Sequence, residues 1–94
     1  MKQVINGKTY NTENMTVLVS VSRYNNGTFA GSDSIRVTKS GAYCFVATSN
    51  GQDLYREAFI EAIDPTEVAA KIEGWTLDDA EQLALIERGL ITEA

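Results

Sequence analysis

The chain has 94 residues, of which 44% are apolar and 22% charged, a composition typical of one small globular domain rather than of a disordered segment. It contains no histidine and one cysteine, which excludes Ser–His and Cys–His catalytic pairs, an internal disulfide and a zinc site. The net charge of −5 disfavours direct contact with nucleic acid or anionic lipid.

The first part of the chain is predicted to form β-strands joined by tight turns. Residues 4–10 contain Asn6-Gly7, the preferred pair for a type I′ hairpin turn. Residues 16–24 alternate between two faces, which predicts a half-buried strand with its odd-numbered valines on one side. Residues 25–34 are rich in Asn, Gly and Ser, and we expect a turn that continues into a long loop.

Two further strands are predicted at residues 34–38 and 42–48, across a short turn that contains glycine. The next segment, residues 54–63, fits both a strand and a helix, because its apolar residues match either period. We favour a strand here, since turn residues precede this segment and a clear helix start follows it.

Two helices are predicted after residue 63. The first begins near Pro65, where Asp64 supplies the N-cap acceptor and Glu67 the third helical position, and Gly74 ends it. The second begins near Leu77 and is closed by a later glycine.

The predicted fold class is therefore α+β within a single domain that spans residues 1–94. A mostly antiparallel sheet from residues 1–63 is expected to carry the two helices of residues 64–94 on one face. Trp75 ends an apolar stripe of the first helix, so we expect it to anchor the helices to the sheet.

No group of residues in the sequence forms a catalytic or metal-binding motif. Cys44 lies within a predicted strand, where a free thiol is usually a small buried hydrophobe. Asp78, Asp79 and Glu81 are close in sequence, but consecutive residues of a helix point about 100° apart, so these side chains do not converge on a metal ion. Acidic residues in the first turn of a helix instead interact favourably with the helix dipole. We expect no enzyme activity, no metal and no cofactor.

Glu57 and Glu61 are the candidates for a pair of carboxylates that act as acid and base. On one strand face Glu57 and Glu61 lie about 13 Å apart, at about 3.3 Å per residue. This separation is too large for a glycosidase pair. The two residues are instead counted with the acidic surface.

Charge is divided unevenly along the chain. Residues 1–50 contain five cations and two acids, a net charge of +3, whereas residues 51–94 contain three cations and eleven acids, a net charge of −8. An acidic surface attracts the basic grooves that hold nucleic acid. The predicted partner contacts, chosen for charge density, are Glu57, Glu61, Glu67, Asp78, Asp79 and Glu81.

Phe29 is a further candidate contact, because an aromatic residue in a polar loop can anchor a partner; the alternative is that its ring packs under its own loop. The basic residues Lys2, Lys8, Arg23, Arg36 and Lys39 show no regular interleaving with aromatic residues. They are interpreted as a solvated face, with a phosphate-binding patch as the lesser alternative.

Residues 5–13 (INGKTYNTE) resemble the opening I-N-G-K-x-Y-[D/N]-T-E of small proteins of bacterial mobile elements and phages. In that group a strand, a hairpin with a Lys/Ser-Gly turn and a capped acidic helix follow, an order that residues 38–43 and 63–67 share. Such proteins resemble anti-CRISPR and other anti-defence inhibitors in size and charge. The resemblance implies stoichiometric binding to a host defence complex, with acidic side chains meeting its nucleic-acid groove.

The leading hypothesis is thus a non-catalytic inhibitor that acts in the bacterial cytoplasm on a protein partner, without contacting nucleic acid or membrane. The sequence has no signal peptide at its start and no apolar stretch of membrane-spanning length. The alternative is a small structural or assembly protein, including a homodimer, that associates through an exposed edge strand.

Overall fold

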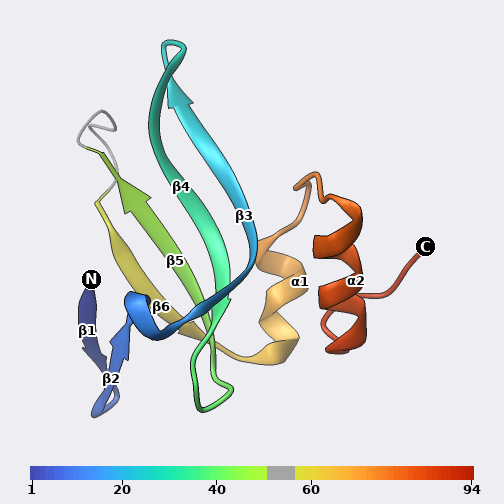
Figure 1. Ribbon diagram of the computed structural model, residues 1–94, viewed down its shortest axis with the longest axis horizontal. Helices are drawn as coiled ribbons and strands as arrows, with labels where there is room; N and C mark the ends of the chain where they lie inside the picture. The colour runs from blue at the N-terminus through green and yellow to red at the C-terminus, as the bar shows by residue number, and fades with distance from the viewer. Residues whose placement is uncertain (51–56) are drawn as a thin grey trace.

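The computed structural model describes residues 1–50 and 57–94. Within these residues the chain is α+β, with six antiparallel strands in two sheets and two C-terminal helices, which confirms the predicted fold class (Figure 1). The strands are β1 (Lys2–Ile5), β2 (Lys8–Asn11), β3 (Thr16–Asn25), β4 (Thr28–Val37), β5 (Tyr43–Ser49) and β6 (Phe59–Ile63). The helices are α1 (Val68–Lys71) and α2 (Asp79–Glu87), with short 3-10 turns at Thr12–Asn14 and Pro65–Glu67.

Strands β1 and β2 form the predicted hairpin and a sheet of their own. Asn6 and Gly7 adopt φ values of 51° and 76°, the left-handed pair that a type I′ turn requires. The side chain of Gln3 accepts a hydrogen bond from the backbone N–H of Ile60 at 3.0 Å. This bond ties the hairpin to strand β6 of the larger sheet.

The larger sheet is an antiparallel meander in the order β3-β4-β5-β6. Its first hairpin corrects the prediction of a long loop at residues 25–34, because β4 already begins at Thr28 and only Asn26-Gly27 forms the turn. Their φ values of 52° and 80° again fit a type I′ turn, which allows the two ten-residue strands to pair up to their tip. The hairpin projects beyond the rest of the sheet (Figure 1).

The regular alternation predicted for residues 16–24 is also wrong in one respect. The pairing of β3 with β4 shifts register between Val17 and Val19, so a bulge interrupts the strand. Val17 is consequently 47% exposed, whereas Leu18 and Val19 are both buried.

The strand interpretation of residues 54–63 is confirmed for β6, which pairs with β5 so that Ile60 lies opposite Val46. Residues 54–56 lie outside the described part of the chain. Glu57 and Ala58 precede the strand and are exposed.

Both predicted helices are present, with later starts than their first cap signals indicate. The segment after Asp64 begins as a 3-10 turn and becomes α-helical only at Val68. Helix α2 begins at Asp79, two residues after the predicted start at Leu77, because Asp78 is its N-cap. No helix in the described residues is long and apolar enough to cross a membrane.

Side chains on the two sides of β5 belong to two separate hydrophobic clusters. The larger, here called the helix-side cluster, contains Leu18, Val19, Ile35, Val37, Phe45, Ala47, Ile63, Val68, Ile72, Leu85 and Leu90. The smaller, here called the hairpin-side cluster, contains Tyr10, Cys44, Val46 and Ile60. Successive residues of β5 alternate between them, as the pleat of a strand requires.

Trp75 follows α1 and packs against the helix-side cluster, with its ring centroid 6.5 Å from that of Phe45. This contact joins the segment between the helices to the middle of the sheet. The position of Trp75 agrees with the anchoring role expected from its place at the end of the apolar stripe.

Candidate functional site

The acidic candidates do not gather into one cluster, and several of them stabilise the fold. Glu67 closes a capping box, because its Oε1 accepts the backbone N–H of Asp64 at 2.9 Å. Both residues remain exposed, so their charge still contributes to the field of the surface.

Asp78 and Glu81 form the second capping box, at the start of α2. The Asp78 carboxylate accepts the N–H of Glu81 at 2.7 Å, and Glu81 Oε1 accepts the N–H of Asp78 at 3.0 Å. Glu81 Oε2 also accepts the backbone N–H of Ser20, on the edge strand β3, at 3.2 Å. Glu81 therefore caps a helix and covers part of a sheet edge with the same carboxylate.

Glu61 and Lys71 form an ion pair, with Oε1 and Nζ 2.5 Å apart. The same ammonium lies 5.4 Å from the ring centroid of Phe45, within cation–π range. Glu57 and Asp79 complete the six predicted acids, and both are exposed. Glu61, Glu67, Asp78 and Glu81 thus have partners within the chain.

The negative charge is nevertheless concentrated in one segment. Residues 64–87, here called the acidic helical segment, contain seven acids and one cation, and that cation is Lys71 of the ion pair. Six of the seven acids are exposed: Asp64, Glu67, Glu73, Asp78, Asp79 and Glu87. Within the described residues, no group of three or more His, Cys, Asp or Glu side chains is arranged to hold a metal ion.

Phe29 lies at the tip of the projecting β3–β4 hairpin rather than in a loop. Its ring is 44% exposed and stands edge-to-face against Tyr24, which is 67% exposed, with the ring centroids 6.1 Å apart. The ring therefore packs against its cross-strand neighbour and still presents an apolar surface to solvent.

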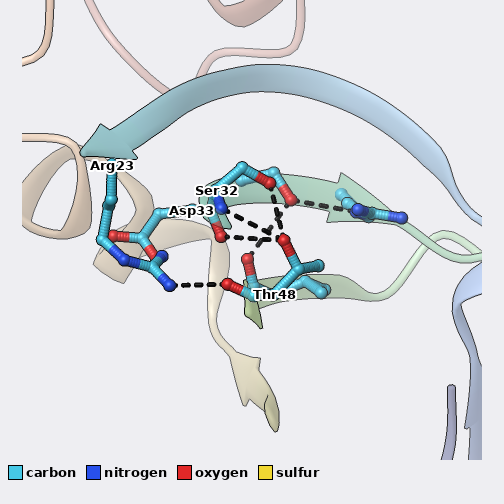
Figure 2. Close-up of polar contacts among 7 residues, drawn as sticks. Arg23, Ser32, Asp33 and Thr48 are labelled. Carbon is cyan, nitrogen blue, oxygen red and sulfur yellow. Dashed lines mark hydrogen bonds and ion pairs between the residues drawn. The ribbon is translucent and has the colours of Figure 1, made fainter. Parts of the chain in front are cut away.

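A polar network holds this hairpin to β5, as Figure 2 shows. Arg23 forms an ion pair with Asp33, and its second guanidinium nitrogen donates to the backbone carbonyl of Thr48 at 2.5 Å. The hydroxyls of Ser32 and Thr48 lie 2.9 Å apart, and the N–H of Ser32 donates to Thr48 Oγ1 at 3.1 Å. The network links three strands at the base of the exposed aromatic pair.

Gly31 makes the close approach of these groups feasible. Its φ of 152° is one that L side chains rarely adopt, and a Cβ atom would lie 2.1 Å from the carbonyl oxygen of Thr48 and 2.8 Å from Arg23 Nη2. No side chain fits there without moving backbone.

The sequence interpretation placed Arg23 and Arg36 on a solvated face, and the structure corrects both. Arg23 is mostly buried in the network above. Arg36 Nε donates to the hydroxyl of the fully buried Ser34 at 2.9 Å, and Arg36 lies opposite Cys44 in the register of β4 and β5. Burial lowers the pKa of Arg36, while the nearby Cys44 raises it.

Cys44 is fully buried in the hairpin-side cluster, as predicted for a structural thiol. Burial raises the pKa of this thiol above its ordinary value, and Arg36 partly opposes the shift. A buried thiol that keeps its proton is a poor nucleophile.

Sequence reasoning missed a cavity of about 460 Å³ between the β1–β2 hairpin and the β4–β5 turn. Its walls include Lys2, Thr9, Asn11, Asn14, Lys39 and Ser40. The two lysines are 37 positions apart in the sequence, so no local spacing signals that they line one cavity.

Comparison of the chain with protein-family models, with curated proteins and with solved structures yields no match.

Proposed function

We propose that this protein is a non-catalytic inhibitor of the anti-CRISPR kind, which binds a nucleic-acid-handling defence complex in the cytoplasm of a bacterial host. In this proposal the acidic helical segment enters the basic groove of the complex and excludes nucleic acid. The observation that carries the proposal is the exposure of six acids within 24 residues whose only cation, Lys71, is paired with Glu61.

The capping boxes support this role in a second way. They fix the two helix starts, so Glu67 and Asp78 present their charge from ordered backbone. Charges held in place lose less conformational entropy on binding than charges on a flexible tail. A groove lined with Lys and Arg to hold a guide–target duplex is the complementary surface.

The test uses charge reversals that spare the capping residues. Glu73, Asp79 and Glu87 are exposed and lie outside both capping boxes, so the triple variant Glu73→Lys/Asp79→Lys/Glu87→Lys removes the surface charge with little effect on helix geometry. Lys8→Glu, on the β-rich part of the chain and outside the lining of the cavity described above, is the control.

A panel of reconstituted CRISPR effector complexes is titrated with each variant, and binding of target DNA is measured at several salt concentrations. The parent should displace DNA from at least one complex, with a steep loss of association rate as salt rises, because exposed charges are screened over about 8 Å at physiological ionic strength. The triple variant should associate about tenfold or more slowly, and the control should match the parent. The proposal is contradicted if the protein binds none of the complexes. It is also contradicted if binding depends neither on the salt concentration nor on the triple charge reversal.

The second candidate is association through the projecting hairpin of β3 and β4, with another protein or a second copy of the chain. The exposed Tyr24–Phe29 pair favours it, as does the position of β3 at the outside of the sheet. The same titrations distinguish the two candidates. The second is favoured if binding does not depend on salt, is abolished by Tyr24→Ser and is unchanged in the triple charge-reversal variant.

A further inference from the structure

We propose that the cavity between the β1–β2 hairpin and the β4–β5 turn, here called the lysine pocket, binds the phosphate group of a small phosphate ester. The proposal does not depend on the inhibitor function, because the pocket is lined by residues outside the acidic helical segment. It rests on the charge, the donors and the size of this cavity.

The charge of the lysine pocket is opposite to that of the molecule. The chain carries −5, yet among the described residues the lining of this cavity includes Lys2 and Lys39 and no acid. Each lysine brings one positive charge to the lining of this cavity, and an anion is the ligand that such charges attract. A phosphate monoester carries nearly two negative charges at neutral pH, so it matches both lysines at once.

The remaining polar groups of the walls can donate hydrogen bonds to phosphate oxygens. Thr9 and Ser40 contribute hydroxyls, and Asn11 and Asn14 contribute amide groups. The amide oxygen of Asn11 already accepts the backbone N–H of Glu13 at 3.1 Å, which orients the side chain and leaves its NH₂ group as a donor.

The wall that carries Lys39 and Ser40 is held in place before any ligand arrives. Thr38 N–H donates to the carbonyl of Ala42 at 2.8 Å, and Ala42 N–H donates to the Thr38 hydroxyl at 3.0 Å. The hydroxyls of Thr38 and Ser40 are 3.1 Å apart. A turn fixed in this way loses little entropy when a ligand binds, which favours affinity.

The size of the cavity points to an ester rather than to the free ion. A volume of about 460 Å³ lies within the range of small-molecule sites and exceeds what one phosphate fills. Met15 supplies an apolar wall for the organic part of the ligand. A free phosphorylated metabolite and the terminal phosphate of a nucleic acid share this chemistry, and the experiment separates them.

The parent protein is titrated at constant ionic strength while its backbone amide resonances are followed by NMR. The probes are inorganic phosphate, AMP, acetate, and a trinucleotide with and without a 5′-phosphate. Phosphate and AMP should shift the amides of Thr9, Asn11, Lys39 and Ser40 in a saturable manner, AMP with a dissociation constant of about 1 mM or below. Tighter binding of the phosphorylated trinucleotide than of AMP would identify a nucleic-acid end as the ligand, and the reverse order a free metabolite.

The decisive variant is Lys2→Gln/Lys39→Gln, with Lys8→Gln as the matched control on the same hairpin but outside the pocket lining. The double variant should bind AMP about tenfold or more weakly, because it loses two charge-assisted contacts, and the control should bind within about twofold of the parent. If the double variant does not fold, Lys39→Gln alone is measured, since it changes only an exposed turn position. No saturable shift with any phosphate probe, equal shifts with acetate, or undiminished binding by the lysine variants would overturn the proposal.

Discussion

The two sides of β5 carry hydrophobic clusters of very different construction. The helix-side cluster joins four strands to both helices and holds eleven buried residues, whereas the hairpin-side cluster holds four, one of which comes from the β1–β2 hairpin. The larger cluster includes residues of four strands and both helices, whereas the smaller one includes residues of β2, β5 and β6 only.

The contrast in packing coincides with a contrast in charge. The helices that cover the larger cluster belong to the acidic helical segment, while the hairpin that covers the smaller cluster contributes Lys2 to the lysine pocket. The lining residues of the lysine pocket lie outside the acidic helical segment, so the two proposals above concern separate parts of the molecule. Substitutions in each cluster measure how much the helices and the β1–β2 hairpin contribute to the free energy of unfolding.

The largest effect is expected from Leu85→Ala in α2. The Leu85 side chain is completely buried in the helix-side cluster, so its truncation loses apolar contacts and leaves a cavity that rigid neighbours cannot fill. The free energy of unfolding, measured with urea, should fall by about 3–5 kcal/mol.

Leu83→Ala is the matched control for this substitution. Leu83 is on the same helix, two positions away, but its side chain is 57% exposed, so its loss should cost within about 0.5 kcal/mol. Equal costs for the two substitutions would show that α2 is not docked on the sheet as described.

A smaller effect is expected from Tyr10→Ala on the other side of the sheet. Tyr10 is the buried member of the hairpin-side cluster that comes from β2, and it packs with Val46 and Ile60. Because the cluster holds only four buried residues, we expect a loss of about 2–3 kcal/mol, at or below the range for large aromatic truncations. Val4→Ala, at a residue 68% exposed on β1, should change stability by no more than about 0.5 kcal/mol.

Comparison of these two losses sharpens the contrast. If Tyr10→Ala leaves the free energy of unfolding almost unchanged, the β1–β2 hairpin does not depend on its packing against the larger sheet. The lysine pocket would then lack one of its fixed walls. A cost as large as that of Leu85→Ala would mean that both faces of the sheet contribute equally to one cooperative core.

Features that depend on local chemistry could be predicted from the sequence. The turn at Asn6-Gly7 follows from the φ > 0 that these residues tolerate, and the start of the helical part follows from Asp64, Pro65 and Glu67. The burial of Cys44 follows from its place within an apolar strand.

Features that depend on contacts between distant residues could not. Strand β4 extends through a Ser- and Gly-rich stretch because Arg23 bridges Asp33 and Thr48 across three strands, and Gly31 is needed beneath that bridge. The double role of Glu81 depends on Ser20, 61 positions earlier in the chain. Periodicity and cap signals carry no information about such pairs.

The smallest predicted effect tests the apolar character of the hairpin-side cluster through the titration of Cys44. Burial raises the pKa of the folded thiol, so between the pKa of the unfolded chain and that of the folded protein only the unfolded state has lost its proton. The folded state then binds more protons than the unfolded state, and the free energy of unfolding falls as pH rises. The contribution of the buried thiol is complete below the unfolded pKa, about 8.5, and is lost as pH rises through the folded pKa.

Urea unfolding of the parent and of Cys44→Ala between about pH 7 and pH 10 isolates this contribution, because the other titrating groups are common to both proteins. The stability advantage of the parent over Cys44→Ala, about 1 kcal/mol at neutral pH, should shrink steadily above that pKa. An advantage that stays constant through the alkaline range would show that the thiol titrates normally, and that water reaches this side of β5 more freely than the packing of Tyr10, Val46 and Ile60 around Cys44 implies.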